Sequence, residues 1–354
     1  MPQAIQKDMT KMKSITCRKI VKAIAPYGLI VLFRWIKERR NIVPLLQLPT
    51  KVRLDASTLC QLKCCPIQKE MTIGKGYLKF EDFKNFILKN NYIKEVELAN
   101  NGEIFLNPDL IHIIKYAHNN NIILTANGGT NFNTVSDEVL EALVKFHFQS
   151  ITIAIDGVSQ EVYSIYRVNG DFNKVIDNIK KLNAYKAKYN SKFPQLAWQF
   201  IIMENNENDI VAAKIMAQQL DMQIWFKLTW DRKYKPKNVE LIRRETGLLS
   251  LTRDELLINE KKIYASNLCN QLWDAPQINY DGLLLGCCVV HKDDFGINVF
   301  KKGLEKALKS KNYNYAKKML LGQVGILKKN KNIPCVNCSI FKRMNEHKIF
   351  LTRP

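Results

Sequence analysis

The feature that most constrains the fold of this chain is a regular alternation of strand-length and helix-length segments between residues 51 and 228. Six apolar runs have the length of buried strands: Val52–Ala56, Glu95–Leu98, Ile122–Thr125, Ile151–Ile155, Trp198–Met203 and Ile224–Leu228. Five helix-length segments separate them: Phe80–Lys89, Pro108–Asn119, Ser136–Phe148, Phe172–Tyr189 and Asp209–Leu220. This alternation predicts right-handed βαβ units and a parallel sheet.

The length of the alternating region narrows the fold further. About 180 residues are too few for a closed eight-stranded barrel, so we predict an α/β fold built as a partial (β/α)6 TIM-like barrel. After about residue 240 the alternation stops and cysteines organise the chain, which predicts a small cysteine-rich C-terminal domain. The expected parts are therefore an N-terminal segment (1–48), the partial barrel (49–240) and the C-terminal domain (241–354).

The N-terminal segment is basic and amphipathic. Between residues 17 and 40 its longest uncharged apolar run is Tyr27–Phe33, far short of the roughly 20 residues that span a bilayer. Residues 17–40 can pack on the main domain or make peripheral membrane contact as an interfacial helix, although Pro26 argues against one continuous helix. The sequence leaves both alternatives open.

The whole chain is basic, with 54 Lys and Arg against 33 Asp and Glu and a formal net charge of +21. Such a charge attracts acidic partners. The lysines are nevertheless spread along the chain, and no basic motif interleaved with aromatic residues is present, so we expect no specific nucleic-acid partner.

Several of the nine cysteines stand in tight pairs, and nothing that resembles a secretory signal precedes them. We therefore expect a cytoplasmic protein in which the clustered cysteines are metal ligands rather than disulfide partners.

The first cysteine set follows the first predicted strand. Three thiols on a strand-to-helix loop can anchor three irons of a 4Fe–4S cluster and leave the fourth iron open. The loop resembles the signature of the radical S-adenosylmethionine (SAM) superfamily, C-x3-C-x2-C. Cys60 and Cys64 match the first interval, whereas the third cysteine is expected at Ile67, so Cys65-Pro66 looks like the usual third Cys-Pro after a two-residue deletion.

The resemblance implies a SAM-binding 4Fe–4S cluster on Cys60, Cys64 and Cys65. Adjacent cysteines must diverge to reach two irons, so two alternatives stay open: a lost or labile cluster that leaves buried thiols, and a zinc site that lacks a fourth ligand.

Further motifs at the strand ends extend the resemblance over residues 49–240: Asn101-Gly102-Glu103, Thr125-Ala-Asn127-Gly128, Ala154-Ile-Asp156-Gly157, and then Glu161, Tyr163 and Arg167. Asn101 departs from the leading glycine of the family's Gly-Gly-Glu motif. By resemblance, Gly102 and Glu103 bind the SAM amino group, Asp156 and Arg167 face its ribose and carboxylate, and Asn127 belongs to the same cofactor site.

The second cysteine set spaces Cys269, Gly282 and Cys287 as C-x12-G-x4-C and adds Cys335-x2-Cys338. It resembles the SPASM type of C-terminal extension and implies one auxiliary 4Fe–4S cluster on these four cysteines. A four-cysteine zinc site is the alternative. Cys288 is a spare thiol, and residues 271–282 are predicted to form a hairpin between the ligands, with Trp273 in the core.

The resemblance implies an enzyme that cleaves SAM to a 5′-deoxyadenosyl radical, which abstracts hydrogen from a substrate. The substrate classes it implies are a peptide, a protein or a carbohydrate, and the reaction requires a one-electron donor. No side-chain acid–base catalyst is predicted, because the cofactor carries the chemistry. The alternative is a non-catalytic scaffold that keeps only the C-terminal metal site.

Overall fold

The computed structural model describes residues 48–64, 72–229, 236–325 and 333–352. Residues 48–351 form one compact unit. Cys65 and the whole segment 17–40 lie outside the described residues, so the expectations that rest on them stay predictions.

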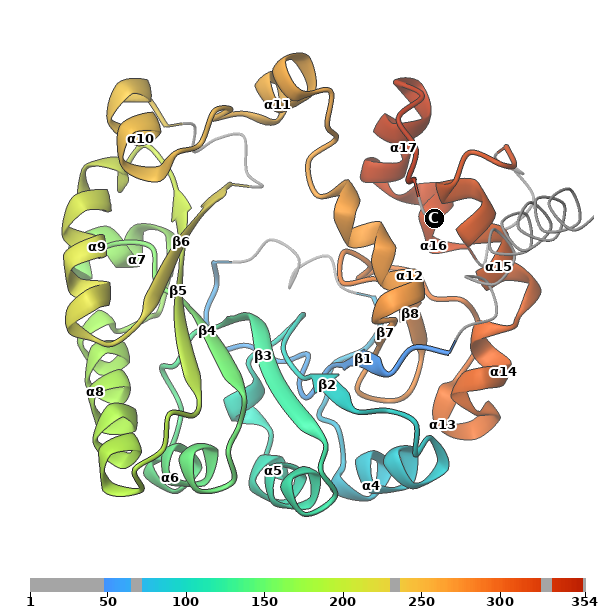
Figure 1. The fold of residues 1–354 in the computed structure, drawn as a ribbon, viewed down its shortest axis with the longest axis horizontal. Helices are drawn as coiled ribbons and strands as arrows, with labels where there is room; N and C mark the ends of the chain where they lie inside the picture. Colours follow the sequence, from blue (N-terminus) through green and yellow to red (C-terminus); the bar gives the residue numbers. More distant parts are fainter. Residues whose placement is uncertain (1–47, 65–71, 230–235, 326–332, 353–354) are drawn as a thin grey trace, which may run out of the picture. The chain divides into compact units, whose positions relative to one another are not determined.

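The core of this unit is a mixed but mostly parallel eight-stranded sheet with the order β6-β5-β4-β3-β2-β1-β7-β8 (Figure 1). The six predicted strands are present as β1 (Lys51–Leu54), β2 (Glu95–Glu97), β3 (Ile123–Thr130), β4 (Ser150–Ala154), β5 (Gln195–Ile202) and β6 (Gln223–Leu228). Each pairs in parallel with its neighbour in this order. The predicted α/β class and parallel sheet are therefore confirmed.

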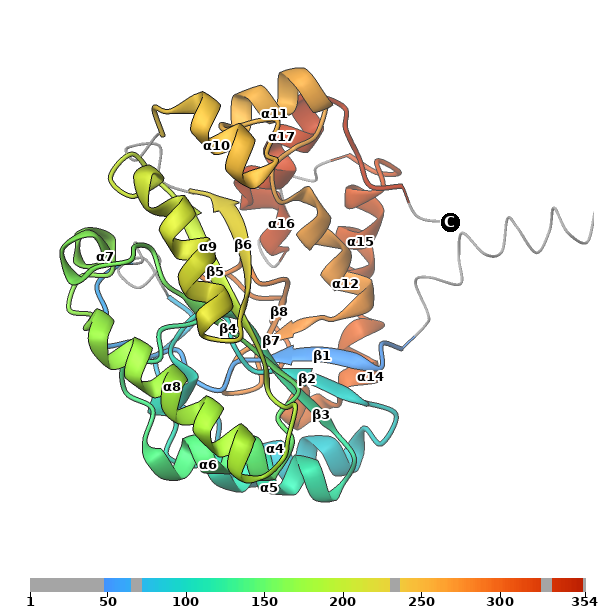
Figure 2. The same cartoon turned by 60° about the vertical axis from the view of Figure 1, so that its left-hand side comes forward.

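The five predicted helices are also present, as α4 (Phe80–Lys89), α5 (Leu110–Asn119), α6 (Asp137–Lys145), α8 (Phe172–Lys188) and α9 (Ile210–Gln219). Figures 1 and 2 show them along one face of the sheet. In α6, Ser136 caps the first turn through the Val139 N–H, and Leu140, Leu143 and Val144 are buried in the core at helical spacing. The helical spacing of its apolar residues thus determines which side of α6 packs against the core.

The sheet is wider than the sequence predicts, because two strands from the C-terminal part extend it beyond β1. β7 (Gln277–Ile278) pairs in parallel with β1, and β8 (Leu284–Gly286) pairs antiparallel with β7. The predicted hairpin is therefore displaced along the chain, because Gln271–Asp274 form the short helix α12 instead. Its turn contains Gly282 at a φ of +91°, which a glycine adopts without strain.

The remaining elements are mostly short helices: η1 (Ile104–Leu106), α7 (Gln160–Tyr166), η2 (Glu207–Asp209), α10 (Val239–Thr246), α11 (Arg253–Glu260), η3 (Ser266–Asn270), α13 (Val299–Lys302), α14 (Leu304–Leu308), α15 (Lys311–Leu320), α16 (Pro334–Asn337) and α17 (Ser339–Glu346). Trp273 is buried in the core, as predicted.

Candidate functional site

The carboxyl ends of β1 to β4 and the loops that follow them carry the residues singled out in the first cysteine set and the strand-end motifs. Because these strands are parallel, their carboxyl ends meet at one edge of the sheet, where functional side chains of such folds gather. We call this region, with Cys60 and Cys64 at its centre, the strand-end site.

Cys60 and Cys64 are half-buried free thiols, and each sulfur accepts a hydrogen bond. Asn131 Nδ2 donates to Cys60 Sγ at 3.6 Å, and Arg167 Nη1 donates to Cys64 Sγ at 3.5 Å. Burial raises the pKa of Cys60 to about 11, while the positive charge of Arg167 acts in the opposite direction. Two thiols that accept N–H bonds suit thiolate ligands of a metal centre, so the described part of this site fits an iron–sulfur cluster.

Arg167 is anchored by a buried ion pair. Its Nε donates to Asp156 Oδ2 at 2.6 Å, and the other carboxylate oxygen of Asp156 accepts from the Ile201 N–H at 2.7 Å. Asp156 is fully buried, whereas Arg167 is 9% exposed. The structure thus brings the two predicted residues together. Asp156 bonds to Arg167, and Arg167 in turn bonds to the sulfur of Cys64.

Gly102 lies against the cysteine loop. A Cβ at this position would stand 2.5 Å from Ser57 O and 2.7 Å from Leu59 O. The next residue, Glu103, donates its N–H to Leu59 O at 2.8 Å. Glycine is therefore required here so that the loop after β2 can pack on the loop that leads to Cys60.

The carboxylate of Glu103 is buried and already has protein partners. Oε2 accepts from the Asn131 N–H at 2.6 Å and Oε1 from the Phe105 N–H at 3.3 Å. Burial raises the pKa of Glu103 to about 7, against these two hydrogen bonds and Arg167, which lower it. In this arrangement Glu103 ties the loop after β3 to the loop after β2.

Asp55 is a site residue that the sequence reasoning missed. It follows β1, is fully buried, and accepts from the Asn101 N–H at 3.3 Å and from Asn101 Nδ2 at 3.2 Å. Burial raises its pKa to about 7, and the bonds from Asn101 lower it. Its only sequence signal is an acidic residue within an otherwise apolar run of strand length. Asn101, which departs from the family motif, is the partner that satisfies it.

Glu97 was missed too, and it fixes the part of β3 that contains Asn127. One carboxylate oxygen of Glu97 accepts from the N–H groups of Asn127 and Gly128 at 2.7 and 3.1 Å, and the other accepts from Thr125 Oγ1 at 2.7 Å. Asn127 is exposed, with Oδ1 accepting from Ser150 Oγ at 3.1 Å. The side chain of Asn127 thus stays exposed in the carboxyl half of β3 while its backbone is fixed.

The second cysteine set forms the C-terminal thiol site. Cys269, Cys287 and Cys335 are buried and Cys338 is half-buried. Burial raises the pKa of Cys269 to about 12 and that of Cys287 and Cys335 well above the ordinary value of 9.0, and the neighbouring thiols raise them further. Such effects require that the four thiols lie near one another, although they come from three places in the sequence.

Across the described ranges, no group of three or more His, Cys, Asp or Glu side chains has the spacing that holds a single metal ion. A cubic cluster places iron and sulfide between its thiols, so its ligands stand farther apart than those of one ion. Four converging thiols, three of them buried, therefore fit a cluster of this kind by their chemistry. Cys288, the spare thiol, is bound to Gln271, whose Oε1 accepts from the Cys288 N–H at 2.8 Å.

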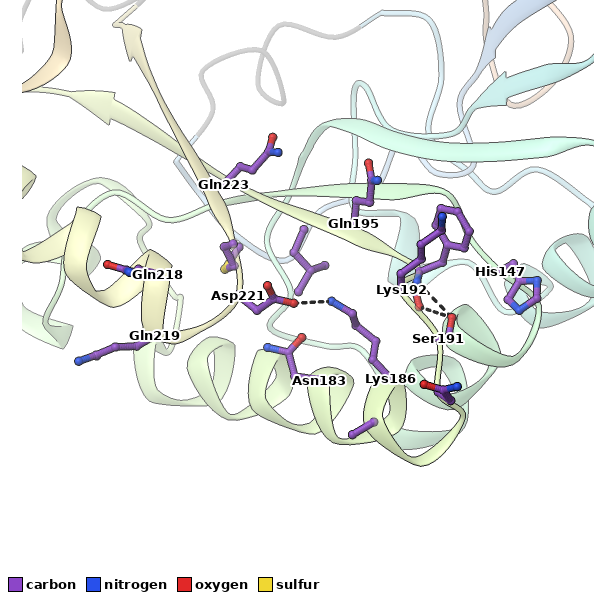
Figure 3. A pocket seen from close by; sticks show the side chains of 15 residues that line it. His147, Asn183, Lys186, Ser191, Lys192, Gln195, Gln218, Gln219, Asp221 and Gln223 are labelled. Carbon is purple, nitrogen blue, oxygen red and sulfur yellow. Dashed lines mark hydrogen bonds and ion pairs between the residues drawn. The ribbon is translucent and has the colours of Figure 1, made fainter.

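A pocket lies away from both thiol sites, at the amino ends of β5 and β6 (Figure 3). Most of the residues that line it are polar, and they include the ion pair of Lys186 with Asp221 at 2.9 Å. Because the strands are parallel, this is the edge of the sheet opposite the strand-end site. The pocket is therefore not part of that site.

Comparison with known proteins places the fold. No family model matches the sequence, and no curated protein matches it. Among solved structures, SuiB from Streptococcus suis bound to S-adenosylmethionine is similar with a TM-score of 0.58 and 13% identity, over 83% of this chain and 70% of that chain. SuiB bound to its precursor peptide SuiA gives 0.57 and 13%, over 90% and 75%.

A second similar protein is anSMEcpe, solved with bound AdoMet and the Cp18Cys peptide. Its TM-score is 0.53 at 15% identity, over 83% of this chain and 88% of that chain. SuiB and anSMEcpe are radical SAM enzymes. The chain shares its fold with radical SAM enzymes. At these identities the likeness establishes the fold, and the chemistry must be argued from the residues.

No helix among the described residues is long and apolar enough to cross a membrane.

Proposed function

We propose that this chain is a radical SAM enzyme whose sheet acts as a partial barrel around a SAM-binding 4Fe–4S cluster on Cys60, Cys64 and Cys65. The observation that carries the proposal is the position of Cys60 and Cys64 at the carboxyl ends of the strands, with N–H donors from Asn131 and Arg167 on their sulfurs. The shared fold supports the same reading.

When bound, the cluster supplies the electron that cleaves SAM into a radical able to abstract hydrogen from a substrate. The residues of this chain bind and orient the reactants. Asn127 is exposed in the carboxyl half of β3 and can reach a ligand, whereas Gly102, Glu103, Asp156 and Arg167 set the position of the loops around it. Burial of these groups excludes water from the base of the site.

Residues 241–354 form, in this proposal, a SPASM-like domain with an auxiliary 4Fe–4S cluster on Cys269, Cys287, Cys335 and Cys338. The convergence of four thiols, three of which have pKa values raised by burial and by the neighbouring thiols, supports it. Residues 49–240 form the radical SAM domain, and residues 1–48 are a separate basic segment.

The substrate in this proposal is a peptide or protein, because SuiB and anSMEcpe have both been solved with peptides. A carbohydrate remains the other class that the sequence implies. The reaction also needs a cytoplasmic one-electron donor.

A specific observation supports a second candidate function, a non-catalytic scaffold that keeps only the C-terminal metal site. Cys64 and Cys65 are adjacent, and both carboxylate oxygens of Glu103 already accept backbone N–H groups instead of facing a free ammonium. Such a chain would retain the fold without cleaving SAM.

One experiment separates the two candidates. Iron and acid-labile sulfide are measured per chain after anaerobic reconstitution, and electron paramagnetic resonance of the reduced protein is recorded with and without SAM. The enzyme predicts about eight irons and a signal that changes with SAM, because two four-iron clusters form. About four irons and a signal that ignores SAM would establish the scaffold instead.

A further inference from the structure

The guanidinium of Arg167 is held in one place from several directions. Its Nε is bound to the buried Asp156 carboxylate, and its charged centre lies 5.4 Å from the ring of Tyr166. The backbone of Arg167 ends α7, donating to Tyr163 O at 2.9 Å and accepting from the Gly170 N–H at 2.8 Å. A side chain anchored in this way keeps its remaining N–H groups aimed in a fixed direction.

That direction is the cysteine loop. Arg167 Nη1 donates to Cys64 Sγ at 3.5 Å, and the N–H of Lys63, one residue before, donates to Val168 O at 3.1 Å. The loop that carries the thiols is therefore docked on the turn after α7 by a side-chain bond and a backbone bond. Arg167 is aimed at a sulfur, not at open space.

A positive charge beside a cluster sulfur favours the reduced cluster, because reduction adds one negative charge. Hydrogen bonds to cluster sulfurs are one of the means by which proteins set the reduction potential. Asp156 offsets part of the charge of Arg167, so the net effect is that of a polarised N–H donor. The sign stays the same: removal of Arg167 disfavours the reduced form.

We infer that Arg167 is a positioning residue that acts on the cluster of the strand-end site through the Cys64 sulfur and raises its reduction potential, before any SAM is bound. This inference rests on the proposed function. It differs from the role that the family resemblance implies, in which Arg167 faces the SAM carboxylate.

The test is a redox titration of the reconstituted full-length chain without SAM, followed by electron paramagnetic resonance. The signal of the strand-end site is identified as the one absent from Cys60→Ser. In Arg167→Gln we expect the reduction potential of this cluster to fall by about 59 mV, because a tenfold shift towards the oxidised form corresponds to that value for a one-electron couple. Arg167→Lys, which keeps the charge, should recover part of the shift.

Arg53→Gln is the matched control. Arg53 is a partly buried arginine whose guanidinium bonds to Gln277 Oε1 at 3.0 Å and Ala99 O at 2.9 Å, with no sulfur among these partners. The reduction potential of the strand-end cluster in Arg53→Gln should match that of the wild type. Thermal unfolding of each variant checks that the fold is kept.

Two results would overturn the inference in distinguishable ways. An unchanged potential in Arg167→Gln, together with weaker SAM binding, would mean that Arg167 acts on SAM alone and would leave the proposed function standing. If Cys60→Ser kept all the iron and all the signals of the wild type, the proposed function would be overturned, and this inference with it.

Discussion

The two thiol sites of this chain differ in what surrounds the sulfurs. At the strand-end site, Cys60 and Cys64 are half-buried and accept N–H bonds from Asn131 and Arg167. At the C-terminal thiol site, three of the four cysteines are buried, and the main neighbours that shift their pKa values are other thiols.

This difference indicates a division of labour. Four thiols that saturate a buried cluster leave no position for a ligand, and bringing them together stabilises the chain that supplies them. A site with fewer thiols and with polar donors keeps a position open and tunes what is bound there. We therefore expect mutations at the C-terminal thiol site to affect stability most, and mutations at the strand-end site to affect chemistry.

The largest effect on stability is expected for Cys335→Ser. Loss of one ligand should empty the C-terminal thiol site and leave the remaining buried thiols without metal, which lowers the free energy of unfolding by roughly 3–5 kcal/mol. Metal content and chemical denaturation measure it, with zinc assayed beside iron. Cys288→Ser, the spare thiol next to Cys287, is the control and should keep its metal. Equal losses in both variants would argue against the four-thiol assignment.

Gly102→Ala should have the next largest effect. Its Cβ would clash with Ser57 O and Leu59 O, so the two loops of the strand-end site must separate, at a cost of about 2 kcal/mol. The melting temperature and the iron content per chain should both fall. Gly325→Ala is the control, because a Cβ there meets nothing within 4 Å. Full iron and an unchanged melting temperature in Gly102→Ala would mean that the loops do not pack as described.

A smaller effect is expected from Asp55→Asn, and it depends on pH. The unfolded chain releases this proton near pH 3.8, whereas the folded chain holds it up to about 7. The folded state binds the proton more tightly between these values, so the contribution of Asp55 falls as pH rises from about 4 to 7. Asp55→Asn has no proton to release at this position, so its free energy of unfolding should not fall over this pH range for this reason.

We expect Asp55→Asn to gain on the order of 1–2 kcal/mol relative to the wild type between pH 4 and pH 8, less than the full shift implies because buried sites relax. Denaturant unfolding at a series of pH values measures the difference. Parallel curves for the two proteins would refute a raised pKa at Asp55.

The smallest effect on stability is expected for Cys60→Ser. The residue is half-buried on a loop, so the free energy of unfolding of the metal-free protein should change by less than about 0.5 kcal/mol. Iron should nevertheless fall by about four per chain, with loss of the response to SAM. Iron analysis beside thermal unfolding of the same sample tests both statements. A large fall in the free energy of unfolding of Cys60→Ser would mean that the two thiol sites do not differ in their effect on stability.

Much of this architecture could be predicted from the sequence. The apolar runs from Val52 to Leu228 locate six strands within a few residues, because buried parallel strands have a strong local signal. The hairpin after Trp273 could not be placed, because its pairing with β1 joins residues more than 200 positions apart. The short helix α7 was also missed, since its seven residues read as part of a motif.

The candidate site was predicted as a set of residues but not as a network. The motifs locate Cys60, Asp156 and Arg167, yet no spacing rule reveals that Arg167 bonds to the Cys64 sulfur. Asp55 and Glu97 escaped notice because burial, not sequence pattern, makes these carboxylates important. The tertiary partners of a polar residue determine what it does, and these partners lie on other segments of the chain.

The pairing of β7 with β1 has a consequence for biosynthesis. The Arg53 and Asp55 N–H groups donate to Pro276 O and Ile278 O, both at 3.0 Å, so β1 acquires its second neighbour from a segment made long after it. During translation the helices and strands up to β6 can assemble, but β1 remains an open edge able to pair with other chains. The last third of the chain thus acts as the cover that ends this exposure, and shortened translation products should aggregate.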